Sequence, residues 1–237
     1  MIYKRLGRYQ DALCLYERIL SVYPTLSCPD EATIKLSIAR AEANQAINLS
    51  LLGNFERAYH LLQQAQGRFN ALGQTSAVVK IELHLAEIDY AQGYYGNALK
   101  RYYQARDSMV QNHIDDPMLQ AELKLQMTDC LVKLNKAQEA CQLANDAVEI
   151  YRQAGMSLST SNALREYTTT LVASGRLKEA LVALNEAWTL LNNGGFDPLA
   201  FAAKLQQAEL LLDLAAELRD RSNIPVFILR KTANKQP

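Results

Sequence analysis

The chain has 237 residues, of which 49% are hydrophobic and 21% are charged, and its 25 basic residues balance its 25 acidic ones. This composition is typical of a folded protein and excludes an intrinsically disordered one. The balanced charge argues against a general nucleic-acid-binding protein, whose phosphate contacts need a clear excess of Lys and Arg.

One short motif recurs along the chain, each time around a predicted turn. Its turn residues, four glycines and one asparagine, are 46, 40, 42 and 40 residues apart. Glycine or asparagine is what a helix end needs where the backbone takes a positive φ. Five residues after each turn residue stands an alanine, which lets two antiparallel helices approach closely. The copies are LGRYQDAL at 6–13, LGNFERAY at 52–59, QGYYGNAL at 92–99, LNKAQEAC at 134–141 and SGRLKEAL at 174–181.

Capping residues set the bounds of the helices between these turns. Asp116 and Asp197 each stand before a proline, as an N-cap acceptor does when proline takes the first helical position. Gly73, Gly155 and Gly194 stand where second helices should end. The expected helices cover residues 30–52, 55–72, 75–92, 95–113, 117–134, 137–154, 159–174, 177–192 and 198–219.

These helices predict one all-α domain over residues 1–219, followed by an irregular basic tail at 220–237. The first repeat keeps only about two turns of its first helix, and the last helix has no partner. Because a repeat buries apolar surface only against its neighbours, we expect a fragment of a longer protein. Alternatively, residues 225–229 fold back as a short cap. The expected repeats are 1–24, 30–72, 75–113, 117–154 and 159–192, with a lone helix at 198–219.

The combination of turn, alanine and helical spacing resembles the tetratricopeptide repeat family over roughly residues 1–215. The chain departs from the family in its missing early tryptophan, in a terminal proline found only as Pro24, and in a period longer than about 34 residues. Long units of this kind look like those of bacterial signalling regulators of the maltose-regulator type, and like those preceding caspase-like CHAT domains. The resemblance implies a right-handed α-solenoid of stacked antiparallel helix pairs.

The chain shows little that could carry catalysis or hold a metal. His84 and Glu87 share a helical face and Glu82 is near in sequence, but no third ligand of matching geometry follows, which favours a polar surface patch. There is no glycine-rich phosphate loop and no nucleophilic triad. We therefore expect a chain that is not an enzyme and that binds no metal and no cofactor.

The cysteines have no metal-site spacing, and at this density disulfides are improbable, which indicates reduced thiols and a cytoplasmic protein. Each lies on or beside an apolar repeat position, so we expect buried structural thiols. They are Cys14, Cys28, Cys130 and Cys141. The most apolar segment, at 208–216, carries two acids and is too short to cross a membrane, so no membrane partner is expected.

The segment YYGNALKRYYQAR at 94–106 places tyrosines beside basic residues, a combination that can stack on and neutralise single-stranded nucleic acid. Tyr95 and Tyr102 occupy core positions of the repeat, which leaves Tyr94 and Tyr103 free. We expect packing with a solvated basic edge and no direct nucleic-acid partner.

The resemblance implies that the first helix of each pair lines an inner groove. The groove residues then mix both charge signs with apolar side chains. They do not reproduce the Lys/Asn clamp of chaperone-binding relatives. Such a groove suits an internal peptide segment, a helix or another domain of the same polypeptide. The predicted groove residues are Arg40, Asn44, Ile47, Lys80, His84, Glu87, Tyr90, Asp129, Lys133, Asn162, Arg165 and Thr169.

Our leading hypothesis is a non-catalytic protein–protein interaction scaffold that forms part of a larger bacterial signalling or regulatory protein. A second hypothesis is the ligand-sensing region of a transcriptional activator, with a sugar or metabolite near Tyr90 and Arg165. A third is a repeat region attached to a caspase-like CHAT protease domain that lies outside this chain.

Overall fold

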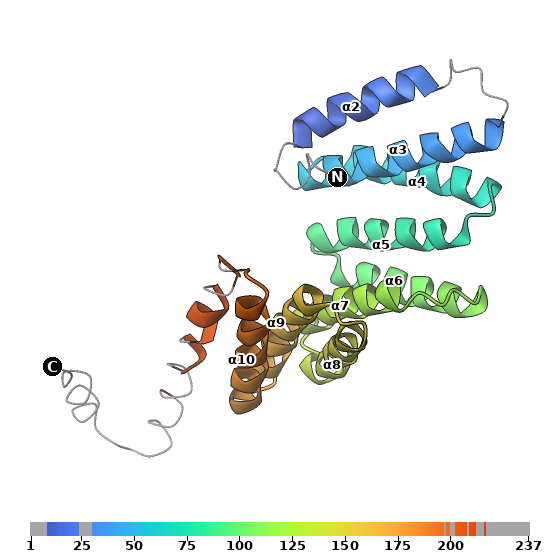
Figure 1. Cartoon of the computed structure of the whole chain (residues 1–237). Coiled ribbons are helices and arrows are strands. Elements are labelled where there is room, and N and C mark those ends of the chain that lie inside the picture. Colours follow the sequence, from blue (N-terminus) through green and yellow to red (C-terminus); the bar gives the residue numbers. More distant parts are fainter. Residues whose placement is uncertain are drawn as a thin grey trace. The chain divides into compact units, whose positions relative to one another are not determined.

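The computed structural model describes residues 9–23, 30–196, 198–199, 202–207, 209–211 and 216, and within them it contains helices and no strand (Figure 1). The helices lie side by side in chain order within each part of the structure. They are α2 (Tyr9–Val22), α3 (Glu31–Leu51), α4 (Phe55–Ala71), α5 (Thr75–Ala91), α6 (Tyr95–Gln111), α7 (Pro117–Lys133), α8 (Ala137–Gln153), α9 (Ser157–Ala173) and α10 (Leu177–Asn193).

The bounds of α3 to α10 differ from the predicted ones by at most two residues at either end. Side-chain caps explain where α3, α4 and α7 begin. Asp30 Oδ1 accepts hydrogen bonds from the backbone N–H groups of Ala32 at 3.1 Å and Thr33 at 3.3 Å. Asp116 Oδ1 accepts one from Leu119 at 3.0 Å, directly before the proline that begins α7. Pro24, Cys28 and Asp197 lie outside the described residues, as do 10 of the 22 residues of the expected last helix and the whole tail.

The turn residues take the backbone conformation that the motif predicts. Gly53, Gly93 and Gly175 have φ of 80°, 83° and 72°, and Asn135 has 59°. Gly194 stands where α10 ends, as predicted: it is the C-cap of that helix, with a φ of −84°, and the following Gly195 takes the positive φ of 72°.

The chain divides into two compact units, residues 1–134 and 135–237. In the first unit, each helix from α2 to α6 contacts the helix that follows it, α3 also contacts α5, and α5 also contacts α7. In the second unit, α8 contacts α9 and α9 contacts α10. The expected single domain over residues 1–219 stays a prediction.

Small side chains lie where the two helices of a pair meet. The motif alanines Ala58, Ala98, Ala140 and Ala180 are 0% exposed and Ala12 is 5% exposed. The facing positions of the first helices are equally buried, with alanine at Ala46 and Ala86 and threonine at Thr128 and Thr168. Both threonine hydroxyls donate to a carbonyl oxygen four residues earlier at 2.8 Å, so their burial leaves no polar group unpaired.

Arg101 of α6 joins three helices of the first unit. Its Nε donates to Asp89 Oδ2 at 2.7 Å and its Nη1 to Glu82 Oε2 at 3.2 Å, both on α5. Its Nη2 donates to the Tyr59 hydroxyl of α4 at 2.7 Å. The side chains of Arg101 and Asp89 are 25% and 13% exposed, so little water screens this pair.

We predict that Arg101→Met lowers the free energy of unfolding by about 1–3 kcal/mol, because it leaves a mostly buried carboxylate without its charged partner. Urea denaturation followed by circular dichroism measures the change. Arg106→Met is the matched control, since Arg106 pairs with Asp107 at the exposed surface of the same helix, where such a pair contributes at most about 1 kcal/mol. An equal loss in both variants would contradict the role given to Arg101.

A second pair of variants tests the turn conformation. Gly93 has a positive φ and Gly96 lies inside α6, and a Cβ at either position would meet no atom within 4 Å. An alanine at either position therefore meets no steric clash, and the two variants differ only in the backbone conformation that the alanine must adopt. We expect Gly93→Ala to destabilise the fold by about 1–2 kcal/mol, the cost of a left-handed alanine. Gly96→Ala should stabilise it by about 0.5–1 kcal/mol through helix propensity. The melting temperature should fall for Gly93→Ala and rise for Gly96→Ala. Shifts of the same sign would refute the turn conformation given to Gly93.

Candidate functional site

The first helices of successive pairs in the first unit, α3, α5 and α7, form one surface because α3 contacts α5 and α5 contacts α7. Nine of the predicted groove residues belong to these helices: Arg40, Asn44, Ile47, Lys80, His84, Glu87, Tyr90, Asp129 and Lys133. The remaining three, Asn162, Arg165 and Thr169, lie on α9 of the second unit. The groove assignment as a whole is not tested by the structure and stays a prediction.

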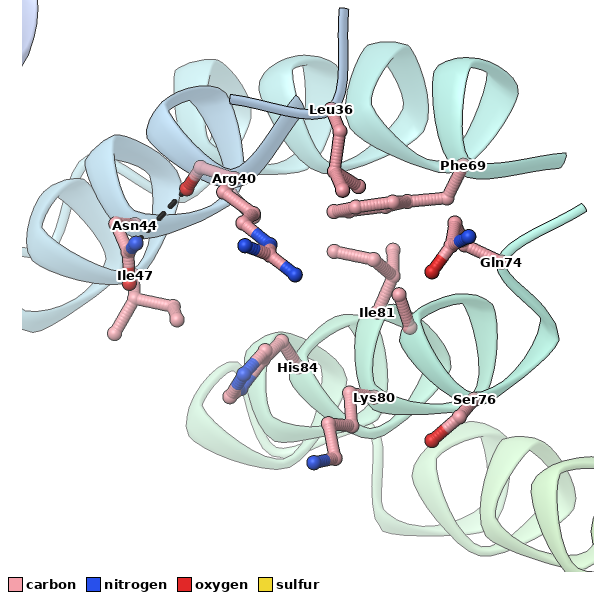
Figure 2. A pocket seen from close by; sticks show the side chains of 12 residues that line it. Leu36, Arg40, Asn44, Ile47, Phe69, Gln74, Ser76, Lys80, Ile81 and His84 are labelled. Carbon is pink, nitrogen blue, oxygen red and sulfur yellow. Dashed lines mark hydrogen bonds between the residues drawn. The ribbon is translucent and has the colours of Figure 1, made fainter. Parts of the chain in front are cut away.

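A pocket of about 360 Å³ opens between α3 and α5. Five of the predicted groove residues line it, three from α3 and two from α5: Arg40, Asn44, Ile47, Lys80 and His84. Figure 2 shows the Arg40 guanidinium extending into the space between the two helices, toward Ile81 and His84. The structure therefore brings together side chains that are up to 44 positions apart in sequence, from residue 40 to residue 84.

One end of the pocket is apolar and was missed by the sequence analysis. Leu36, Phe69 and Ile81 converge there, and the Phe69 ring of α4 reaches between the two first helices (Figure 2). The sequence analysis considered only first helices, whereas Phe69 belongs to a second one. The signal was present: Phe69 continues the buried positions Leu62 and Ala65 at helical spacing, and all three are at most 4% exposed.

The pocket lining is basic. Arg40, Lys80 and His84 contribute to it, and no Asp or Glu does. Within the described ranges, neither Arg40 nor Lys80 has a carboxylate within salt-bridge distance. The side-chain amide of Asn44 donates a hydrogen bond to the Arg40 carbonyl oxygen of its own helix at 2.9 Å. The pocket thus offers hydrogen-bond donors and positive charge beside an apolar wall.

The neighbouring part of the surface, on α5 and α7, is acidic. Glu87 Oε2 lies 2.9 Å from His84 Nδ1, and Glu87 Oε1 accepts a hydrogen bond from Gln126 Nε2 at 3.4 Å. Partial desolvation raises the pKa of Glu122 on α7 and the negative charge of Glu87 raises it further, while the nearby His84 and Lys80 lower it. Glu122 is nevertheless exposed to solvent. A ligand can therefore reach this carboxylate, whose negative charge is disfavoured by its surroundings.

Glu82, His84 and Glu87 do not assemble into one site. Glu82 accepts hydrogen bonds from Gln66 of α4 and Arg101 of α6, whereas Glu87 pairs with His84 of its own helix and with Gln126 of α7. In the part of the chain that the structure describes, no group of three His, Cys, Asp or Glu side chains could hold a metal ion.

The cysteine prediction holds at two positions and is wrong at a third. Cys130 and Cys141 are buried, and burial followed by the charge of Asp129 raises the pKa of Cys130 to about 12, which keeps its thiol neutral. Cys14 is exposed. It follows Ala12 by two residues, about 200° around the helix, so it faces away from the buried alanine. Cys28 lies outside the described residues.

The tyrosines of residues 94–106 divide between core and surface. Tyr102 is 0% exposed, as predicted, and burial raises the pKa of its hydroxyl. Tyr95 is only half-buried and packs edge-on against Tyr90 with ring centroids 5.2 Å apart. Tyr94 is 58% exposed, and Tyr103 packs under the Arg106 guanidinium at 4.9 Å. Tyr90, a predicted groove residue, is thus partly covered by its neighbour.

Among the described helices, none combines the length and the apolar character that a membrane-spanning segment needs. No protein-family model and no curated protein sequence matches the chain.

Solved structures share the fold at low sequence identity. BtubC (BKLC) from P. vanneervenii matches 97% of this chain and 94% of its own, with 16% identity and a TM-score of 0.68. A STAND protein with a tetratricopeptide repeat sensor, PH0952 from Pyrococcus horikoshii, matches 94% of this chain and 35% of its own, with 14% identity and a TM-score of 0.70. PlcR from Bacillus thuringiensis, solved in complex with the peptide PapR7 and DNA, matches 85% and 70%, with 13% identity and a TM-score of 0.65.

The predicted resemblance and the predicted fold class are confirmed by these likenesses and by the observed helix pairs. The closer resemblance to maltose-regulator-type or CHAT-linked repeats stays a prediction. The chain has the tetratricopeptide-like repeat fold, an α-solenoid of stacked antiparallel helix pairs.

Proposed function

We propose that the chain is a non-catalytic scaffold that binds a segment of a protein partner on the surface formed by α3, α5 and α7. The observation that carries this proposal is the pocket between α3 and α5, which combines positively charged and apolar side chains in one concavity. Mixed linings of this kind bury an apolar group of the ligand while a few polar groups set its orientation.

The helical framework supports binding without rearrangement. The pocket residues project from helices whose contacts are buried alanines and large apolar side chains such as Leu62 and Leu85. A surface held in this way does not have to be ordered when a partner binds, so less of the interaction energy is lost as entropy.

A peptide partner is compatible with the fold, since PlcR was solved with a bound peptide. The same structure contains DNA. For this chain, 25 basic residues against 25 acidic ones favour a protein segment over a nucleic acid. The partner is then a peptide of another protein or a neighbouring domain of the same polypeptide, within a bacterial signalling or regulatory protein.

The metabolite-sensing hypothesis gains no support from the placement of its residues. Tyr90 and Arg165 belong to different compact units, and Tyr90 is not among the residues that line the pocket. That hypothesis stays a prediction, as does the attachment of a CHAT protease domain.

A steric block tests the proposal. Asn44 lines the pocket and is exposed, so we predict that Asn44→Trp fills the pocket and leaves the fold intact. Twelve-residue peptides selected from a randomised displayed library on the native chain provide the probe. Fluorescence anisotropy should show at least a tenfold weaker dissociation constant for Asn44→Trp, with little change in melting temperature.

Gln63→Trp is the matched control, because Gln63 is exposed on the second helix α4 and does not line the pocket. It should bind the selected peptides like the native chain. Failure to select any peptide above background, or an equal loss in both variants, would overturn the proposal.

A further inference from the structure

We propose that the bound segment carries opposite charges at a set spacing: an acidic residue next to an apolar one occupies the pocket between α3 and α5, and a basic residue lies over α5 and α7. This inference rests on the proposed function and specifies the chemistry of the partner. It follows from the change in sign of the charge between two adjacent parts of one surface.

The pocket supplies the site for the acidic residue. Arg40 from α3 and Lys80 from α5 line the same concavity, and no carboxylate in the lining offsets them. Two like charges around one space repel each other, and a ligand carboxylate there gains attraction from both. The Arg40 guanidinium, which extends between the helices in Figure 2, is also able to bind a carboxylate through two parallel hydrogen bonds.

The volume of the pocket indicates that more than a carboxylate enters it. At about 360 Å³ the pocket has room for a second side chain. Phe69 and Ile81 are themselves buried, so the accessible part of the apolar wall belongs to the half-buried side chains Leu36 and Ile47, and a lone anion would leave it in water. A hydrophobic residue adjacent to the acidic one covers the wall and gains about 25 cal/mol for each Å² of apolar surface removed from water.

The neighbouring surface supplies the site for the basic residue. Glu87 of α5 accepts a hydrogen bond from Gln126 of α7, and Glu122 lies one turn before Gln126 on the same face of α7. The charge of Glu87 raises the pKa of Glu122, whereas the charges of His84 and Lys80 lower it. Glu122 has no hydrogen-bond donor among the described residues, whereas Glu87 has His84 and Gln126. The two carboxylates repel each other, and Glu122 still has no hydrogen-bond donor in the described part of the chain. A bound ammonium or guanidinium group would supply that donor and relieve the repulsion. His84 lies between the two regions and borders both.

The rise of α5 sets the spacing between the two charges. Lys80 of the basic region and Glu87 of the acidic region are seven residues apart on this helix, which is about 10.5 Å along its axis. An extended peptide rises about 3.3 Å per residue. The acidic and basic residues of an extended segment that follows α5 are therefore about three positions apart.

Parallel selections from the randomised library test this inference. One selection uses the native chain and the other uses the double variant Arg40→Glu with Lys80→Glu, both exposed positions. On the native chain, we expect enriched peptides with an acidic residue beside an apolar one and a basic residue about three positions away. On the double variant, the acidic position should be replaced by Lys or Arg, while the apolar neighbour persists.

Defined peptides complete the test by anisotropy. An enriched peptide with both ends blocked should lose at least tenfold in affinity when its acidic residue becomes Gln, and should regain affinity for the double variant when that residue becomes Lys. Glu122→Gln should weaken binding only for peptides that keep the basic residue. Blocked ends exclude recognition of a free terminal carboxylate, and free glutamate up to millimolar concentration should not compete.

The outcomes separate this inference from the proposed function. Peptides enriched on the native chain with no charge preference, or with the same preference on the double variant, overturn the inference and leave the scaffold function in place. Competition by free glutamate at the affinity of the peptide overturns it in favour of a small-molecule site. Enrichment of no peptide on the native chain overturns both.

Discussion

The close approach of two antiparallel helices at a buried alanine is the contact on which the other features of this fold depend. At Ala58, Ala98, Ala140 and Ala180 no side-chain surface is left exposed, so the facing helix packs directly against the backbone. This proximity lets large residues one turn away, such as Leu62 and Tyr102, fill the space on either side. A larger side chain at the alanine position would separate the helices and remove contact from all these residues at once.

The same contact determines which surface is available for binding. Because each second helix buries its alanine side against a first helix, the first helices α3, α5 and α7 contact one another along a common surface. Side chains on that surface then come together in space, although whole helices separate them in sequence. Arg40 and Lys80 share a pocket for this reason, and Glu87 lies within the electrostatic reach of Glu122.

Several polar side chains of the first unit pair across helices and so support the helix packing. Arg101 satisfies two carboxylates and a tyrosine hydroxyl from two other helices, and its charge is compensated by Asp89 and Glu82. Arg40 and Lys80 differ from it, since each is exposed and the pocket around them holds no acid. Basic side chains that stabilise the fold and basic side chains that remain available to a ligand are thus distinguished by their partners, which their positions in the sequence do not reveal.

The sequence alone determined the helices and their pairing. Local signals decide both: glycine or asparagine permits the positive φ that reverses the chain, and Asp30 and Asp116 cap helices through bonds to residues two or three positions away. Repetition of the alanine then identifies the contact face of each second helix. Five pocket residues were predicted in the same way, from helical spacing on the first helices. Only the tertiary structure showed that Phe69 of α4 completes the pocket and that Glu82 of α5 pairs with Arg101 of α6. These facts depend on how far and in which direction side chains from separate helices reach, and the distances between helices are set by packing, which no local pattern encodes.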